Sequence, residues 1–373
     1  MKICFIAHLN DLSGANRSLV DLIFQLRNDN EITVIIPRKG ELSEFLEKNG
    51  IPFKTILSGM WVYSNTEKKI KIISKLLINI LAEVNFFSYF LFNKFDIVHF
   101  NSSTYGCGAK SLSLLKQKYT WHIRELAEET FSLKFFNKKK SLKLINNSEK
   151  VIVISEFISQ HIKNEVDINK VEIIYNGIKI PSKKEINKVS INGLLFVGAI
   201  NYDKGQLVAL QAMNYLLKKN GTVLPITFLG KVTNFHYMKR IEKYIDQNEL
   251  NPYVTFKGYK QDISRYRTPD KIVLICSEQE AFGRVTIEAM ANQEIVIGNN
   301  AGATPEIIID GKYGYLYDGG HIDLAEKIDM VTKNKINDKM INESYEYVEK
   351  HFSIKKTANM IERLFENITR IKR

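Results

Sequence analysis

Two carboxylates, Glu280 and Glu288, flank a glycine in the stretch 280–288, which reads EAFGRVTIE. An apolar run, 271–276, precedes this stretch, and a helix-like segment overlaps its end. The pattern predicts that a buried strand ends near Ser277 and that a helix begins near Val285. The free backbone amides of that first helical turn, at the positive end of the helix dipole, would form an anion site.

The two acids suit a different ligand from the amides beside them. Because like charges repel, Glu280 and Glu288 would not bind a phosphate group directly. A carboxylate accepts strong hydrogen bonds from hydroxyl groups, so a neutral polyol such as a ribose or a hexose fits them. The stretch therefore predicts a site for a ligand that has both an anionic part and a sugar part.

The elements that would position this stretch follow an α/β pattern along the chain. A chain of 373 residues is too long for one ordinary core and fits two domains of about 150 to 200 residues. Short β-branched runs alternate with longer helical patterns, which is typical of parallel sheets. The predicted strands are 2–7, 32–36, 53–56, 96–100, 119–122, 151–154 and 171–174, and then 194–197, 226–229, 254–257, 272–276 and 294–298.

This alternation predicts two Rossmann-like, doubly wound domains that face each other across a cleft. The predicted N-terminal domain is 1–182, and a lysine-rich linker, 183–190, follows it. The predicted second domain is 191–340. Residues 341–373 read as C-terminal helices, and one arrangement open to them is to pack back on the N-terminal domain.

In open parallel sheets, ligands bind beyond the carboxyl ends of the strands. The loop after the first strand, 8–18, contains Gly14 but lacks the G-x-G-x-x-G spacing, so a dinucleotide dehydrogenase is poorly supported. The corresponding loop of the second half, 198–205, contains Lys204. This lysine could reach a phosphate as a compact charge, or it could simply cap a solvated loop.

Composition narrows the class of protein and its partners. The net charge of +12 is spread over both halves, whereas a nucleic-acid binder concentrates its basic residues more sharply, so no nucleic-acid partner is expected. Three scattered cysteines argue for a reducing compartment. The N-terminal apolar run is too short for a signal peptide and reads as a first strand. We therefore expect a cytoplasmic protein.

One apolar region raises the question of a membrane surface. Residues 70–92 are interrupted by Lys71, Lys75 and Glu83, which favours an amphipathic helix over a membrane-spanning one. Lysines cluster just before this region and again between 134 and 143. They form either a solvated helix face or a surface that lies on anionic lipid, which would make the protein peripheral on the inner face of the membrane.

Taken in order, several motifs resemble those of glycosyltransferase family 4, a retaining family with the GT-B fold. The resemblance covers nearly the whole chain and rests on the segments 13–19 (SGANRSL), 121–125 (WHIRE), 153–155 (VIS), 175–178 (YNGI), 196–205 (with VG and KG), 280–288 and 299–316. Each segment alone is weak. The ordered set is specific.

The resemblance implies roles for residues of the second half. Glu288 would bind the ribose hydroxyls of a nucleotide-sugar donor, and Glu280 would lie against the donor hexose near the reacting carbon. Lys204 would neutralise the leaving diphosphate. Phe282 and Gly283 would present backbone amides to the sugar.

Further implied contacts come from both halves of the chain. Val285 and Thr286 would present amides to the diphosphate. Gly14 would let a helix terminus approach the same phosphate or the acceptor, and His122 would line the gap between domains beside the sugar. Gly230 and Tyr259 lie where the loops of the family wrap the base.

One position departs from the family pattern. The family commonly has an arginine directly after the glycine of the V-G motif, where this chain has Ala199. Arg284 is the candidate to supply the missing charge, and the open alternative is a salt bridge between Arg284 and a neighbouring acid. His122 has an alternative too, as a satisfied core histidine.

The implied reaction needs donors and cations that stabilise a departing nucleoside diphosphate. The chain has no D-x-D pair and no His/Cys cluster with ligand spacing, so we expect a metal-independent reaction without a cofactor, in which the nucleotide-sugar is a substrate. The expected reaction transfers a hexose with retention to a saccharide or lipid-linked saccharide, in cell-surface polysaccharide assembly. A soluble acceptor is the alternative.

Two other functions stay open on the same fold. A GT-B nucleotide-sugar epimerase or a phosphorylase would share the pair of domains but not the full set of motifs from Gly14 to Glu288. A non-catalytic GT-B partner subunit is favoured only by Ala199, and Glu280, Glu288 and Lys204 argue against it.

Overall fold

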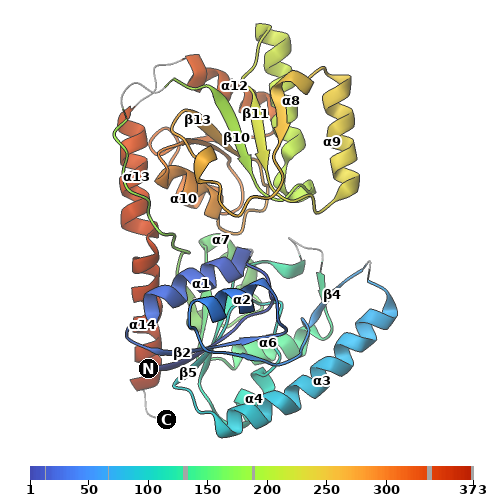
Figure 1. Ribbon diagram of the computed structural model, residues 1–373, viewed down its shortest axis with the longest axis vertical. Coiled ribbons are helices and arrows are strands. Elements are labelled where there is room, and N and C mark those ends of the chain that lie inside the picture. Colours follow the sequence, from blue (N-terminus) through green and yellow to red (C-terminus); the bar gives the residue numbers. More distant parts are fainter. Residues whose placement is uncertain (13, 66, 129–132, 187–189, 334–337, 371–373) are drawn as a thin grey trace. The chain divides into compact units, whose positions relative to one another are not determined.

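The computed structural model describes residues 1–12, 14–65, 67–128, 133–186, 190–333 and 338–370 (Figure 1). It divides into two compact units, of which the first comprises Met1–Lys179 and Ile354–Arg373 and the second Ile180–Ser353. Residues 187–189 of the predicted linker lie outside the described residues. So do 334–337, at the end of the predicted second domain, and 371–373, at the end of the predicted C-terminal helices.

The first unit is built on a seven-stranded sheet in the order β3-β2-β1-β5-β6-β8-β9, and all its strand pairs are parallel. The strands are β1 (Lys2–Ile6), β2 (Glu31–Ile36), β3 (Phe53–Thr55), β5 (Ile97–Phe100), β6 (Tyr119–Ile123), β8 (Lys150–Val153) and β9 (Val171–Ile173). A separate antiparallel pair joins β4 (Val62–Ser64) to β7 (Leu133–Phe135). The helices are α1 (Gly14–Leu26), α2 (Glu41–Lys48), α3 (Lys69–Phe92), α4 (Ala109–Leu114), α6 (Lys138–Asn146), α7 (Glu156–Ile162) and α14 (Ile354–Arg370).

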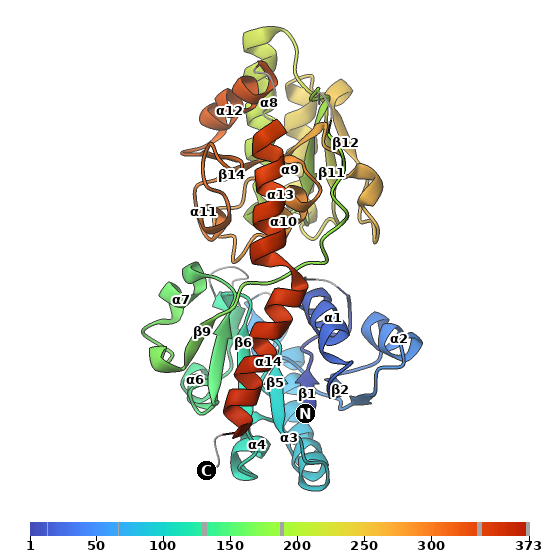
Figure 2. The same ribbon diagram turned by 90° about the vertical axis from the view of Figure 1, so that its left-hand side faces the viewer.

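The C-terminal helix α14 completes the core of the first unit, although it follows the whole second unit in the sequence. Its residues Ile361 and Phe365 are fully buried and share a hydrophobic cluster with Phe5 of β1 and Leu19 of α1. Figure 2 shows α14 along one face of the sheet, beside α1. The amphipathic pattern of 354–370 therefore finds its apolar partner in the first unit.

The second unit has a six-stranded parallel sheet in the order β12-β11-β10-β13-β14-β15. Its strands are β10 (Gly193–Val197), β11 (Ile226–Leu229), β12 (Val254–Phe256), β13 (Lys271–Ile275), β14 (Ile295–Asn299) and β15 (Tyr315–Tyr317). Its helices are α8 (Gln206–Asn220), α9 (Phe235–Gln247), α10 (Arg284–Ala291), α11 (Thr304–Ile307), α12 (His321–Lys333) and α13 (Asp338–Phe352). Leu194, Phe196 and Ile272 lie in its core.

The predicted parallel α/β architecture is confirmed in both halves. Every predicted strand range overlaps an observed strand. Strands that are buried on both faces, such as β10 and β13, read as nearly continuous apolar runs. Three strands were not predicted: β4, β7 and β15. Each has only three residues, but so do β3, β9 and β12, which were predicted, so length alone does not explain why these strands were missed.

The strand order reverses once in each sheet. In the first unit the reversal falls between β1 and β5, and in the second between β10 and β13. Loops that leave adjacent strands in opposite directions open a crevice at such a point, and ligands of doubly wound proteins bind there. Five of the predicted site residues of the second unit lie beyond the ends of β10 and β13, namely Lys204, Glu280, Gly283, Val285 and Thr286.

No helix in the described part of the chain combines the length and the apolar character needed to cross a membrane.

Candidate functional site

The loops after β10 and β13 meet at the reversal of the second sheet. Gly205, at the end of the β10 loop, has a φ of +73°, and a Cβ there would lie 2.5 Å from the carbonyl oxygen of Cys276. Only glycine lets the two loops come this close. A small pocket of about 50 Å³ lies at this point. Its lining residues are Phe196, Val197, Gly198, Lys204, Leu274, Ile275, Cys276, Ser277, Glu280, Gly283, Val285 and Thr286.

Helix α10 begins at this pocket. Gly283 precedes it in a left-handed conformation (φ 102°), and the helix starts at Arg284, one residue before the predicted start. The amides of the first turn, which include those of Val285 and Thr286, have no carbonyl acceptor within the helix. The buried hydroxyl of Thr286 also lacks a hydrogen-bond partner among the described residues. Polar donors thus lie at the pocket, and the anion site that the sequence predicted there stays a prediction.

Glu280 and Lys204 form an ion pair across this pocket. Lys204 Nζ lies 2.8 Å from Glu280 Oε2. Burial alone would raise the pKa of the Glu280 carboxyl, but Lys204 and the hydrogen bonds from Ser277 and the Gly283 amide outweigh burial and hold that pKa below its usual range. Glu280 is therefore ionised at neutral pH. The acid predicted to contact a sugar and the cation predicted to contact its phosphate neutralise each other here.

Glu288 lies between two arginines. Arg284 Nε is 2.9 Å from Glu288 Oε1, as an i,i+4 pair on α10, and Arg267 donates to Oε2 at 3.4 Å. The structure thus shows the salt bridge that the sequence left open for Arg284. A role for Arg284 at the phosphate stays a prediction.

Arg267 and its second partner Glu294 were missed by the sequence reading. Arg267 is only 2% exposed, and its guanidinium lies 2.8 Å from Glu294 Oε2. Burial raises the pKa of Glu294 to about 7, although Arg267 opposes this shift. Neither residue belongs to a motif, and they are far apart in the sequence, so no spacing signal could have paired them. Glu294 thus holds Arg267, and Arg267 in turn contacts Glu288.

The remaining predicted residues of the second unit surround this centre. The Phe282 side chain is buried against Phe352 of α13, with ring centroids 6.0 Å apart, so its backbone is what remains for a ligand. Gly230 follows β11, and its amide donates to the Gly258 carbonyl at 3.0 Å. Tyr259 is exposed just beyond β12. Gly230 lies against Gly198 at the end of β10, and a base-binding role for these two residues stays a prediction.

Gly14 and His122 belong to the first unit. Gly14 begins α1 with a φ of 47°. His122, at the end of β6, is buried, and its Nδ1 lies 3.3 Å from His99 Nε2, while its Nε2 has no partner among the described residues. Burial, assisted by Arg124, holds the pKa of His122 well below its usual range. The ring is therefore neutral at physiological pH, and half of its hydrogen-bonding capacity is unused.

A second polar cluster lies in the loops beyond β5, β6 and β9. Arg124 donates its Nε–H to Asn101 Oδ1 at 3.0 Å and also contacts the Asn176 side chain. Asn176 belongs to the segment 175–178, one of those that carry the family resemblance. Its amide oxygen helps to hold the buried Arg124.

Across the ranges that the structure describes, no group of three or more His, Cys, Asp or Glu side chains is placed to hold a metal ion.

Comparison with known proteins assigns this geometry to a family. A family model described as Glycosyltransferase Family 4 matches residues 12–180, and one described as Glycosyl transferases group 1 matches residues 180–347. The fold is that of the GT-B glycosyltransferases, as predicted. The two models together match residues 12–347, and the chain belongs to the glycosyltransferases of the family 4 type.

Individual relatives agree with this class. The capsular polysaccharide biosynthesis glycosyltransferase CapH of Staphylococcus aureus is 24% identical over 317 residues, which cover 82% of this chain and 83% of that protein. An uncharacterized glycosyltransferase of Methanocaldococcus jannaschii is 29% identical, and the match spans 60% of this chain but only 61% of the relative. Anabaena HepE, crystallised with UDP and glucose, superposes with a TM-score of 0.77 at 18% identity, over 98% of this chain and all of that one.

The buried Arg267–Glu294 pair predicts a pH dependence of stability. Because the pKa of Glu294 is about 7 in the folded protein and 4.5 ordinarily, the folded state binds this proton more tightly than the unfolded state. Stability from this group is therefore present at low pH and is lost as pH rises from 4.5 to about 7, by on the order of 3 kcal/mol. Urea unfolding between pH 4.5 and 7 measures the free energy of unfolding of wild type and of Glu294→Gln, and the wild-type value minus the variant value should fall as pH rises. A difference that stays constant with pH would contradict a raised pKa at Glu294.

Proposed function

We propose that this chain is a retaining glycosyltransferase that moves a hexose from a nucleotide-sugar donor to a saccharide or lipid-linked saccharide acceptor, in the assembly of a cell-surface polysaccharide. The observation that carries this proposal is the Glu280–Lys204 ion pair at the N-terminus of α10, with Glu288 on the same helix. The capsular relative supports the pathway, and the neighbour that holds UDP and glucose supports a UDP-sugar as the first donor to test. In this proposal the enzyme works on the cytoplasmic side of the membrane, without metal or cofactor.

In the proposed complex, the diphosphate occupies the space in front of the first turn of α10. The amides of Val285 and Thr286 donate to it, and the helix dipole favours its charge. An ammonium group has three donors, so Lys204 can keep one hydrogen bond to Glu280 and turn the others to a phosphate oxygen. Glu288, fixed by Arg284 and Arg267, accepts from the ribose hydroxyls, and Glu280 accepts from the hexose.

The reaction then requires little beyond charge stabilisation at the leaving group. The bond between the anomeric carbon and the phosphate oxygen breaks, and a bond from the acceptor oxygen forms on the same face. The acceptor hydroxyl gives its proton to the departing diphosphate oxygen, so no side-chain base is needed. Lys204 and the helix amides stabilise the negative charge that develops on the diphosphate.

Retention of configuration is the first expected outcome. The linkage of the isolated product, read by NMR from the anomeric proton coupling, should match the anomer of the donor. This follows from attack on the face that the diphosphate leaves. A product with the opposite anomer would contradict the proposed step and would call for a side-chain base.

The second expected outcome is slow release of nucleoside diphosphate from a UDP-sugar by the purified chain without acceptor. Glu288→Ala should lower this rate about 10- to 100-fold, which corresponds to about 1.5 to 3 kcal/mol for hydrogen bonds to a charged group. Glu278→Ala, which removes an exposed acid from the loop between β13 and α10, is the control and should leave the rate unchanged. Absence of any release across a panel of donors would favour the non-catalytic partner subunit, and interconversion of the donor sugar would favour an epimerase.

Arg284 gives a third outcome, because its two roles predict different kinetics. If it also meets the phosphate charge, Arg284→Ala should lower kcat about 100-fold, the size of a lost charge-stabilising donor, while Arg284→Lys keeps most of the turnover. If it only holds Glu288, both variants should raise KM for the donor with little change in kcat. Equal losses of kcat in the two variants would also refute the phosphate role.

A further inference from the structure

Helix α3 exposes an unusual amount of apolar surface. Of its 24 residues only Ala82, Phe86 and Phe90 are buried, and they form a single narrow stripe. The large apolar side chains left exposed are Ile70, Ile73, Leu76, Leu77, Ile80, Leu81, Val84, Phe87, Leu91 and Phe92. A contiguous patch of this kind on a folded protein marks an interaction site. The sequence predicted an amphipathic helix here, and the structure leaves most of its large apolar side chains exposed.

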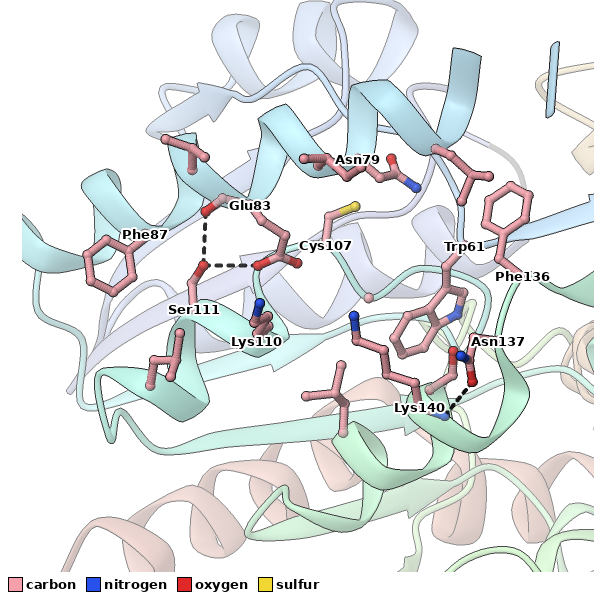
Figure 3. A pocket seen from close by; sticks show the side chains of 17 residues that line it. Trp61, Asn79, Glu83, Phe87, Cys107, Lys110, Ser111, Phe136, Asn137 and Lys140 are labelled. Atoms are coloured by element: carbon pink, nitrogen blue, oxygen red, sulfur yellow. Dashed lines mark hydrogen bonds between the residues drawn. The ribbon is translucent and has the colours of Figure 1, made fainter. Parts of the chain in front are cut away.

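A pocket of about 610 Å³ lies beside this helix, within the first unit. One wall is α3, with Ile80, Val84 and Phe87, and the other is formed by α4 and α6, with Leu114 and Leu144. Trp61 and Phe136 line one end (Figure 3). The volume falls within the range of about 300 to 1,000 Å³ that is usual for small-molecule pockets, and the lining is mainly aliphatic and aromatic.

Polar anchors hold this pocket open. The Glu83 carboxylate accepts hydrogen bonds from the Gly108 amide at 2.8 Å and from Ser111 Oγ at 3.0 Å, which tie α3 to the start of α4. Nearer the start of α3, Asn79 Oδ1 accepts from the Gly59 amide at 2.7 Å. Gly106 has no side chain, so the Trp61 ring fills that place, where a Cβ would lie 2.0 Å from it. The cavity is therefore pre-formed.

Two lysines and one acid line the pocket, so its charged side chains are mainly basic. Helix α6 (KKKSLKLIN) and helix α4 (AKSLSL) contain lysines and no acids, and Glu83 is the only acid of α3. Lys110 and Lys140 line the pocket itself and extend toward it from the α4 and α6 side (Figure 3). Lys138 is already paired with Glu128 and Glu165, so it contributes less. A ligand with a hydrocarbon part and an anionic head would match both the apolar walls of the pocket and the two lysines, Lys110 and Lys140.

A second copy of the chain fits this surface less well. Ile70, Ile73, Leu77, Ile80, Val84, Phe87 and Leu91 do follow a three-and-four spacing, as in a coiled coil. The flanking positions of a coiled coil carry charged pairs, however, whereas here Leu76 and Leu81 widen the apolar stripe. A two-fold pair would also bring the lysine-rich rim against itself.

We propose that the pocket between α3, α4 and α6 binds the hydrocarbon chain of a lipid acceptor that bears a phosphate, with Lys110 and Lys140 facing the phosphate. The exposed row of α3 then lies in the membrane interface around that lipid. This inference rests on the proposed function, because it names the class of acceptor to which the sugar is transferred.

Dodecyl phosphate below its micelle concentration is a suitable probe. The chain has two tryptophans, and Trp61 lines the pocket, so intrinsic fluorescence reports occupancy. Dodecyl phosphate should change the fluorescence saturably, and inorganic phosphate alone should not. Lys110→Ala combined with Lys140→Ala should weaken this binding at least tenfold, while Lys143→Ala, on the same helix but outside the pocket, should not.

Two matched variants distinguish binding of dodecyl phosphate inside the pocket from nonspecific adsorption to the exposed face of α3. Val84 lines the pocket and is 62% exposed, whereas Leu81 is 66% exposed on the same helix and does not line it. Both tolerate a polar side chain in the fold, because neither is buried. Val84→Glu should weaken dodecyl phosphate binding at least tenfold, and Leu81→Glu should leave it unchanged.

Three results would overturn the inference: no saturable response in wild type, equal weakening by Val84→Glu and Leu81→Glu, or a concentration-dependent dimer that Val84→Glu abolishes in sedimentation. Donor hydrolysis by the same preparations keeps the two proposals apart. Donor hydrolysis without binding of dodecyl phosphate would refute only the lipid pocket. Binding of dodecyl phosphate without donor hydrolysis would refute the transferase function and leave the pocket as a lipid site.

Discussion

The ion pair between Lys204 and Glu280 is the interaction on which the proposed chemistry depends. It joins the loops of two neighbouring parallel strands at the point where the strand order of the second sheet reverses. Three local features bring the two groups together: the close contact of Gly205 with the end of β13, the left-handed Gly283 before α10, and the buried Ser277. Without a ligand, the pair keeps a cation and a carboxylate at the start of α10 at little electrostatic cost. In the proposed complex a diphosphate offers Lys204 a second anionic partner, and the contact with Glu280 would orient the lysine before the donor arrives.

Glu288 is held by a buried arginine that also pairs with a second acid. Arg267 is buried between two acids, one that faces the site and one that is fully enclosed. A buried charge of this kind is costly unless it is paired, so Arg267 and Glu294 depend on each other. Their pairing leaves Glu288 with fixed guanidinium partners on both sides. A carboxylate held in this way is pre-organised to accept hydrogen bonds from a diol, which is a property of the network rather than of Glu288 alone.

The sequence predicted the fold well where a signal is repeated along the chain. Buried parallel strands such as 194–197 and 272–275 are apolar throughout, and glycines at 198, 205 and 283 mark the turns where the chain must change direction. The residues of the E-x7-E stretch and Lys204 could be named because they follow motifs with a fixed order. Arg267 and Glu294 could not, since a buried ion pair between two segments without a motif leaves no pattern in either. The pocket beside α3 was equally hidden. The sequence showed an apolar helix interrupted by Lys71, Lys75 and Glu83, but only the structure shows that most of its large apolar side chains are exposed and that Glu83 ties α3 to the start of α4 beside a cavity.

The affinity of the full chain for UDP, compared with that for uridine, tests the central role of Lys204 most directly. Uridine has no phosphate, so the two ligands differ only in the group that Lys204 is proposed to contact. Calorimetric titration should show that Lys204→Ala weakens UDP binding at least tenfold, or about 1.4 kcal/mol, and leaves uridine binding unchanged. Unchanged affinity for UDP, or an equal loss for both ligands, would show that Lys204 does not meet the diphosphate and would contradict the proposed site.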